Sequence, residues 1–423
     1  MLYFEWGDKN GILTEDDLKK HVFSTFDKLG TKKRVLAIPP DFTRYHSFAG
    51  PITELVWEYY QDSLKDILPA LGTHSTMTAT QIRTMFGRTP DSLFRKHNWR
   101  HDLVTLGEVP SSFVNKVSEG RLNYNWPAQV NKLLVGGNYD LILSIGQVVP
   151  HEVIGMANYN KNIFIGTGGA EGINKSHYLG AVYGMERIMG RAKTPVREVL
   201  NYASDHFGRH LPVVYILTVV GKDEKSQLCI KGLYIGDDEE CFLKASDLSL
   251  EVNFTMMGNP LEKVVVYLDP GEYKSTWLGD KSIYRTRMAL ADEGELIILA
   301  PGLREFGEDP EIDRLIRKYG YRTTEEILEF TSRNPELQEN LSAAAHLIHG
   351  SSENRFRITY CPGKLSREEI EGINYQYADL KNMIQKYNPD VLEDGFNSVG
   401  GEEIFFISNP ALGLWSTRER FER

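Results

Sequence analysis

The stretch Arg34-Val-Leu-Ala-Ile-Pro-Pro-Asp41-Phe-Thr43-Arg44 begins the pattern that decides the fold. A short apolar run ends there at two prolines, which predicts a buried strand followed by a turn. Further strands are expected at residues 68–74, 103–106, 140–145 and 162–166, with helical patterns at 51–67 and 78–85. Because short strands alternate with longer helices, this half of the chain is expected to form a parallel α/β sheet.

The alternation restarts after a group of turn-forming residues at 256–260. Before this break we expect a helix at 195–206, a strand at 213–220 and meandering strands over 228–254. After it we expect strands at 263–268 and 295–300 and helices at 282–292, 310–318, 324–333 and 337–347. The chain is therefore predicted to form two α/β domains, with parallel or mixed sheets flanked by helices and an active-site cleft between the domains. The expected boundaries are 1–257, 258–408, and a segment at 409–423 that returns to the first domain.

The composition of the 423 residues is that of an ordinary globular protein, with 41% hydrophobic and 25% charged residues. The formal net charge of −10 repels phosphate backbones, so nucleic acid is excluded as a main partner, whereas a small anion is not. The longest apolar stretch, residues 211–220, is about half the length that spans a bilayer. Three cysteines without metal or disulfide spacing fit a reducing compartment. We expect a cytoplasmic protein without a membrane partner.

Asp41, Thr43 and Arg44 directly follow the first predicted strand. Ligands of open α/β sheets bind at the carboxyl ends of strands, and an arginine guanidinium pairs well with a carboxylate or a phosphate. These residues therefore predict an anion site. The alternative is that Asp41 or Thr43 only caps a turn.

Two histidines, His74 and His151, stand at the expected ends of two further strands. A single histidine is more often structural than catalytic, but imidazoles exchange protons near neutral pH. Two of them at the same edge of one sheet predict acid and base catalysis. The polar stretch at residues 97–102 is interpreted mainly as a scaffold for these side chains.

The glycine-rich run from Gly166 to Ser176 follows an expected strand and suits phosphate binding by backbone amides. Its spacing matches neither the dinucleotide nor the P-loop pattern, so NAD and ATP are not supported. In the second domain, Trp277, Tyr284 and Arg285 follow the strand at 263–268. They either bind a substrate anion or begin a helix with a solvated basic face.

Asp41-x-Thr-Arg44, Gly72-Thr-His74, residues 97–102 and Pro150-His151 followed by Gly168-Gly169 together resemble the nickel-pincer lactate racemase family, over essentially the whole chain. The resemblance implies an α/β enzyme that inverts a carbon bearing a hydroxyl next to a carboxylate. It also implies a nicotinate-derived mononucleotide that carries nickel through two sulfurs and a carbon, and that accepts and returns a hydride.

Several site residues follow from this resemblance. His74 and His151 would act as alternate acid and base. Asp41 and Arg44 fall on the acidic and carboxylate-binding positions, and Tyr284 falls on a substrate-lining tyrosine. Arg285 stands where the family has a glutamine. The residues expected to bind substrate in the second domain are Trp277, Tyr284 and Arg285.

The resemblance further implies a lysine that anchors the cofactor and a histidine that binds nickel. Aligning Gly168-Gly169 puts Glu171 at the lysine position, and no histidine occurs between residues 178 and 205. Lys175 and His177 lie close by and are left as candidates for these two roles, and the residues that would bind a metal are not assigned. The expected cofactor-binding residues are Thr43, Gly168, Gly169, Lys175 and His177.

The predicted function is that of a racemase or epimerase of a 2-hydroxy acid, such as a sugar acid or another polyol acid. The alternative is a paralogue that lacks the cofactor and binds an anionic metabolite in the same cleft. Proteins that mature the cofactor are expected as partners if the nickel-pincer nucleotide is bound. Closure of the two domains on each other is expected to complete the site.

Overall fold

A computed structural model of the chain describes residues 1–422. It contains two compact units, residues 1–176 with 189–253, and residues 177–188 with 254 onward. Each unit is built from a sheet flanked by helices, which confirms the predicted α/β fold class. The division differs from the expected boundaries because residues 177–188 and the C-terminal segment cluster with the second unit. The C-terminal strand β18 (Leu414–Thr417) pairs there with β11 (Phe254–Met257).

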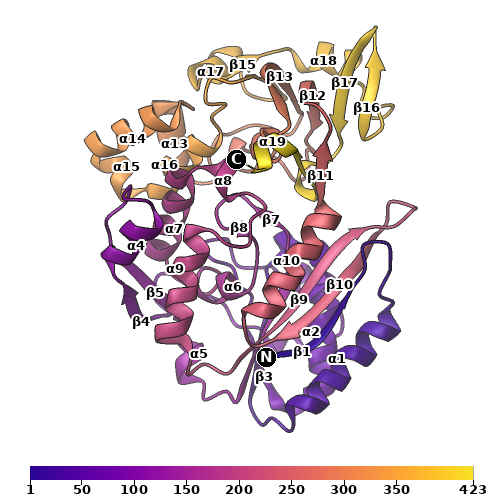
Figure 1. Cartoon of the computed structure of the whole chain (residues 1–423), viewed down its shortest axis with the longest axis vertical. Coiled ribbons are helices and arrows are strands. Elements are labelled where there is room, and N and C mark those ends of the chain that lie inside the picture. Colours follow the sequence, from indigo (N-terminus) through magenta and orange to yellow (C-terminus); the bar gives the residue numbers. More distant parts are fainter. Residues whose placement is uncertain (423) are drawn as a thin grey trace. The chain divides into compact units, whose positions relative to one another are not determined.

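The first unit is centred on a six-stranded mixed sheet with the order β1-β10-β9-β6-β2-β3 (Figure 1). Strands β3, β2, β6 and β9 are parallel, and β10 and β1 are antiparallel to their neighbours. The strand bounds are β1 Leu2–Gly7, β2 Val35–Ile38, β3 Leu64–Ile67, β6 Leu141–Gln147, β9 Val213–Lys222 and β10 Leu228–Gly236.

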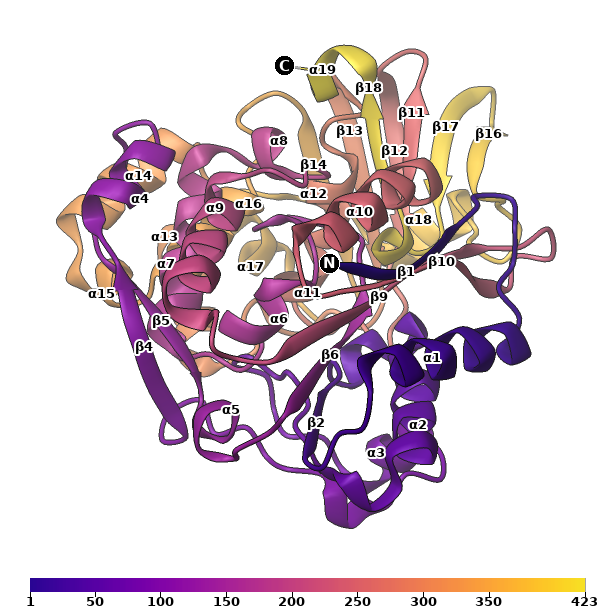
Figure 2. The same ribbon diagram turned by 60° about the horizontal axis from the view of Figure 1, so that its bottom comes forward.

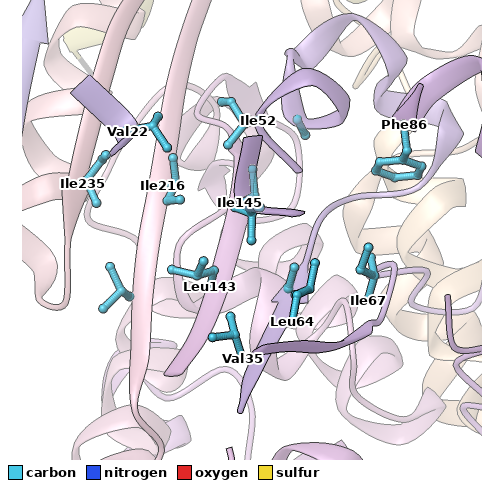
Figure 3. Packing of buried hydrophobic residues seen from close by; sticks show 14 of the residues in the cluster. Val22, Val35, Ile52, Leu64, Ile67, Phe86, Leu143, Ile145, Ile216 and Ile235 are labelled. Carbon is cyan, nitrogen blue, oxygen red and sulfur yellow. The ribbon is translucent and has the colours of Figure 1, made fainter. Parts of the chain in front are cut away.

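Helices α1 (Glu15–Leu29) and α2 (Ala49–Tyr60) cover one face of this sheet, and α10 (Glu239–Asn253) packs across β9 and β10. Alternate strand residues point to the same face, so each strand contributes every second side chain to one core. Figure 3 shows this core, in which side chains from β2, β3, β6, β9 and β10 meet Val22 and Ile52 from the helices. The strand side chains labelled there include Val35, Leu64, Leu143, Ile145, Ile216 and Ile235.

The remaining elements of the first unit form a smaller two-stranded sheet, a two-residue pair and short helices. Their bounds are η1 Phe42–Ser47, η2 Gln61–Ser63, α3 Ala79–Phe86, η3 Asp91–Leu93, β4 Leu103–Val109, α4 Ser111–Val117, β5 Trp126–Asn131, α5 Lys132–Gly136, β7 Pro150–His151, β8 Gly155–Met156, α6 Asn160–Phe164, α9 Pro195–Ala203 and η4 Ser204–Gly208. Helix α7 (Ala170–Tyr183) runs from the first unit into the second.

The second unit has its own six-stranded sheet with the order β15-β14-β13-β12-β17-β16, and all pairs except β16–β17 are parallel (Figure 2). Its strands are β12 Leu261–Tyr267, β13 Leu290–Ala300, β14 Arg357–Pro362, β15 Gln376–Tyr377, β16 Gly395–Val399 and β17 Glu402–Ile407. Its helices are α8 Met185–Ile188, α11 Thr276–Gly279, α12 Lys281–Thr286, α13 Pro310–Tyr319, α14 Thr324–Arg333, α15 Pro335–Glu339, α16 Leu341–His349, α17 Arg367–Gly372, α18 Leu380–Lys386, η5 Pro410–Leu412 and α19 Arg418–Glu422.

Several predicted elements were wrong. The second strand is β3, which ends at Ile67, and residues 68–74 form a loop instead. Residues 162–166 begin in helix α6 rather than a strand, because short apolar runs do not distinguish a buried helical turn from a strand. The second half of the meander predicted over 228–254 is helix α10, and strand β13 begins inside the helix expected at 282–292.

No helix within residues 1–422 is long and apolar enough to cross a membrane.

Candidate active site

The first unit has a topological switch point between β2 and β6. From β2 the chain goes to β3 on one side, and it later returns to place β6 on the other side of β2. Their carboxyl ends, Ile38 and Gln147, lie on the same edge of the sheet because the two strands are parallel. Open α/β sheets bind their ligands at such a point. The expected strand-end residues Asp41 and His151 both follow these two strands.

Asp41 is buried, with an exposed fraction of 4%, and it caps the short helix η1. Its Oδ1 accepts hydrogen bonds from the backbone N–H of Thr43 at 3.1 Å and from the Thr43 hydroxyl at 2.5 Å. Burial by itself raises the pKa of Asp41, but the hydrogen bond and charge of His74, the Thr43 hydroxyl and the Arg44 charge lower it below its usual value. Asp41 is therefore both a cap and an ionised partner for His74.

His74 lies in the loop after β3, and its Nδ1 is 2.7 Å from Asp41 Oδ2. Gly72 allows the loop to turn with a φ of 57°, and its N–H donates to the carbonyl of Gly166. Since the carboxylate is ionised, Nδ1 carries the proton and donates it. When the imidazole is neutral, the second nitrogen, Nε2, has the lone pair, and the side chain is 57% exposed. This is the arrangement of an oriented general base.

His151 lies in β7 and its hydrogen bonding differs from that of His74. Its Nδ1 accepts a hydrogen bond from the backbone N–H of Val153 at 3.1 Å, so a neutral ring would carry its proton on Nε2. The side chain is buried, and the carboxylate of Glu152 is 3.8 Å from Nδ1. The two histidines therefore present different tautomers, one with a lone pair at Nε2 and one with a proton.

Lys161, in α6, is the residue that reasoning from the sequence missed. Burial, together with the positive charges of Arg44 and Arg197, lowers its pKa to about 8, while Glu152 and Asp41 oppose the shift. These electrostatic interactions place its amine among the charged groups of the switch point. The signal in the sequence is a lone cation in the otherwise uncharged stretch at residues 153–170.

The α6 helix is attached to the switch point through Asn162. Its Nδ2 donates to the carbonyl of Ile38 at 2.9 Å and to the Ser144 hydroxyl at 3.1 Å, so it joins β2, β6 and α6. A Cβ on Gly146 of β6 would lie 2.1 Å from the amide of Asn158, which explains why this position has no side chain.

Gly168 and Gly169 follow helix α6, so the strand that the phosphate-cradle prediction assumed before them does not exist. A Cβ on Gly168 would lie 1.9 Å from the carbonyl of Phe164, which makes close packing the reason for this glycine. The Gly168 carbonyl accepts a hydrogen bond from Nε2 of buried His97, whose Nδ1 is 3.0 Å from the amide of Asn131. The scaffold interpretation of residues 97–102 agrees with this geometry.

Lys175 and His177, the candidates for anchoring the cofactor and binding nickel, both lie on α7. The Lys175 amine pairs with Glu171 at 2.6 Å, donates to the carbonyl of Asn125 at 2.8 Å and lies above the Tyr124 ring. His177 is the first residue of the second unit. Within residues 1–422 no three His, Cys, Asp or Glu side chains are placed to hold a metal ion.

Trp277, Tyr284 and Arg285 come together in the second unit, on α11 and α12. The Trp277 ring is 4.5 Å from the ring of His346, and the Tyr284 ring lies 6.2 Å from that of His349. Arg285 is 3% exposed, and one of its guanidinium nitrogens donates to the carbonyl of Gly413. The alternative of a solvated basic helix face is therefore wrong for Arg285.

Comparisons with known proteins agree with this architecture. No curated protein matches the chain. The crystal structure of a protein from Thermotoga maritima is similar, with 24% identity and a TM-score of 0.82 over 98% of this chain and 100% of that chain. The lactate racemase apoprotein from Thermoanaerobacterium thermosaccharolyticum has 18% identity and a TM-score of 0.71, over 97% of this chain and 96% of its own. These two likenesses show a shared fold.

The family models identify one part of the chain more specifically. Residues 21–188 match the lactate racemase N-terminal domain, a range that includes Asp41, Arg44, His74, His151 and Lys161. The resemblance to the lactate racemase family seen in the sequence is therefore confirmed over residues 21–188.

Proposed function

We propose that the protein is a racemase or epimerase of a 2-hydroxy acid. The observation that carries this proposal is the hydrogen bond from His74 Nδ1 to Asp41 at the switch point, which leaves Nε2 as the basic atom beside a carboxylate on which the charge of Arg44 also acts. Arg44 would bind the substrate carboxylate through its guanidinium fork. His74 would take the proton of the 2-hydroxyl, and His151 would do so for the opposite enantiomer.

The residues present fit a covalently held nucleotide cofactor. The resemblance implies an anchoring lysine, and we propose Lys161 for this role in place of Lys175. A pKa of about 8 leaves a useful fraction of the Lys161 amine neutral and nucleophilic near neutral pH, whereas the Lys175 amine is held by Glu171. His177 would be the protein's ligand to nickel. When bound, this group would supply an acceptor for the hydride on C2 of the substrate.

A paralogue that binds an anionic metabolite without catalysis is the competing function. The two differ in the metal and the covalent group that the protein carries when it is produced with cofactor-maturation proteins. The proposal predicts nickel in the purified protein and added mass on the peptide that contains Lys161. Nickel-free protein of unmodified mass, under conditions that load a known lactate racemase, would support the binding protein instead.

The activity is tested on a panel of 2-hydroxy acids that carry deuterium at C2. Inversion should be detected by chiral chromatography, and the product should keep deuterium because hydride transfer does not exchange the label with water. Loss of the label during inversion would replace hydride transfer by proton abstraction at C2. An absence of inversion across the panel by nickel-loaded protein would overturn the proposed function.

Lys161→Arg keeps a positive charge but removes the nucleophilic amine. We expect this variant to lose the added mass and nearly all activity, since arginine stays protonated at any working pH. Lys175→Arg is the matched control, because arginine retains the ion pair with Glu171. If Lys175→Arg loses the group and Lys161→Arg keeps it, the original assignment to Lys175 is restored.

A further inference from the structure

A buried arginine on α9 contacts the turn that precedes Lys161. Arg197 is 1% exposed, and its two terminal nitrogens donate to the carbonyls of Met156 at 2.7 Å and of Asn158 at 3.2 Å, and to the side-chain oxygen of Asn160. No carboxylate within residues 1–422 forms an ion pair with it, and its Nε has no hydrogen-bond partner there. Burying a guanidinium in this way is costly.

The turn that Arg197 holds is strained. Asn158 and Tyr159 are consecutive residues in the left-handed region, with φ of 67° and 58°. Such residues each cost of the order of 1 kcal/mol or more and persist only where surrounding contacts impose them. The next two residues begin α6 and include Lys161. A buried charge and a strained backbone therefore meet immediately before the proposed anchor.

The surroundings of Arg197 are aromatic rather than acidic. Its guanidinium carbon lies 4.2 Å from the centre of the Phe242 ring and 5.7 Å from that of Tyr159. Burial lowers the pKa of Arg197 to about 9, with Tyr159, Tyr215 and Glu239 opposing the shift. The guanidinium is still positive at neutral pH, and its charge acts on Lys161 together with those of Arg44, Glu152 and Asp41.

We propose that Arg197 is a positioning residue that presents Lys161: its fork holds the strained turn at residues 156–160 immediately before α6, and it places a buried positive charge at that turn. An uncharged residue of the same length would supply neither the fork nor the charge. This role goes beyond the proposed racemase function. It rests on that function only for the statement that the Lys161 amine anchors the cofactor. The chemistry of the amine can be measured without cofactor or substrate.

The test is competitive acetylation of the unloaded, full-length protein with trace acetic anhydride between pH 6 and 10. The acetylation rate of each lysine is read by mass spectrometry of its peptide, with Lys175 as the internal reference. In the unaltered protein Lys161 should titrate near pH 8. In Arg197→Met its midpoint should rise by about one pH unit, so that its rate at pH 7.5 falls about tenfold relative to Lys175.

Two further variants separate charge from geometry. Arg197→Lys keeps the charge and should restore the low midpoint, while its single ammonium should leave the turn at 156–160 less protected in hydrogen exchange. Asn160→Asp puts a carboxylate beside Arg197 without removing it and should raise the Lys161 midpoint, which keeps the test available if Arg197→Met does not fold. Arg287→Met, a buried arginine of the second unit, is the control.

An unchanged Lys161 midpoint in folded Arg197→Met and in Asn160→Asp would overturn the proposal, and so would a midpoint shift in Arg287→Met of the same size. Because the measurement uses no substrate, a failure of racemase activity leaves its outcome intact. Conversely, active enzyme with an unshifted Lys161 would disprove only the role of Arg197.

Discussion

The residue that organises the candidate site is Asp41, because it determines which nitrogen of His74 carries the proton. The hydrogen bond of 2.7 Å joins residues that are 33 positions apart in the chain. Because Asp41 accepts from His74 Nδ1, the basic atom of His74 is Nε2. In His151, Nδ1 instead accepts from the N–H of Val153, so a neutral His151 has the opposite tautomer. In their neutral forms, His74 would thus accept a proton at Nε2 and His151 would donate one from Nε2.

Asp41→Asn tests this assignment. The amide keeps the size of the side chain but no longer stabilises a protonated Nδ1, so His74 should adopt the wrong tautomer for a base. We expect kcat to fall by about 10²–10⁴-fold, the usual contribution of an oriented general base. The measurement is steady-state inversion of the substrate identified in the panel.

The control for Asp41→Asn is His101→Asn, which changes an exposed histidine of the same unit and should leave kcat unchanged. Thermal unfolding of both variants separates catalysis from stability. A loss of activity that is matched by a collapse of the melting temperature would indicate that Asp41 acts only as the cap of η1.

At the scale of elements, the short helix α6 is the part whose placement matters most. It has five residues, so it has little stability of its own and depends on tertiary contacts. Asn162 supplies two of them, to β2 and to β6, and Arg197 holds the turn before the helix. The cationic side chain of Lys161 is therefore positioned by residues of three other elements.

Asn162→Ala should detach α6 from the ends of β2 and β6. The loss leaves the buried carbonyl of Ile38 and the hydroxyl of Ser144 without this donor, which costs about 1–3 kcal/mol of unfolding free energy. We expect the acetylation midpoint of Lys161 to move toward that of an ordinary lysine in the same variant. Chemical denaturation and the acetylation assay measure the two effects.

Asn334→Ala is the comparison for Asn162→Ala, because it removes a side-chain hydrogen bond to a backbone carbonyl in the second unit. It should lower stability by a smaller amount and leave Lys161 unchanged. Equal effects of both variants on Lys161 would show that its environment responds to global stability rather than to α6.

At the scale of the whole molecule, the second unit contributes a buried polar cluster around Asp280. Its carboxylate accepts hydrogen bonds from the hydroxyls of Tyr360 at 2.7 Å and Tyr375 at 3.2 Å, and His346 lies 3.5 Å away. The same histidine ring contacts Trp277, and Asp280 joins helices α11 and α12. The helices that carry the proposed substrate-binding residues of this unit are therefore packed around an ionisable carboxyl group, that of Asp280.

This cluster makes stability dependent on pH. Burial raises the pKa of Asp280 to about 7, against the opposing hydrogen bonds of Tyr360, Tyr321 and Tyr375. The folded state thus holds the proton more tightly than the unfolded state, whose carboxyl has its ordinary pKa near 4. The stabilising contribution is complete below pH 4 and is lost as the pH rises to about 7.

Asp280→Asn removes this titration. Relative to the unaltered protein, the variant should gain unfolding free energy between pH 4 and 7, by about 1.4 kcal/mol per pH unit within that window. Chemical denaturation at pH 4.5, 6 and 7.5 measures the difference. Asp62→Asn, which changes an exposed carboxylate of the first unit, is the comparison variant. A flat difference for Asp280→Asn would mean that Asp280 is ionised throughout.

Local pattern was sufficient for the fold class and for part of the site. The apolar run at 35–38 became β2, and the polar residues after it lie at a switch point, because the end of a buried strand leaves room for a ligand. Val213–Lys222 and Leu261–Tyr267 were also found as strands, since each is longer and richer in β-branched residues than the ambiguous runs.

Only tertiary structure decided the rest. His74 was expected at the end of a strand, but it reaches Asp41 from a loop whose path depends on a contact between Gly72 and Gly166. Lys161 looked ordinary in the sequence, because its pKa is lowered by burial and by the charges of Arg44 and Arg197, which only the fold brings near it. Burial and long-range electrostatics are properties of the folded chain, and no window of neighbouring residues contains them.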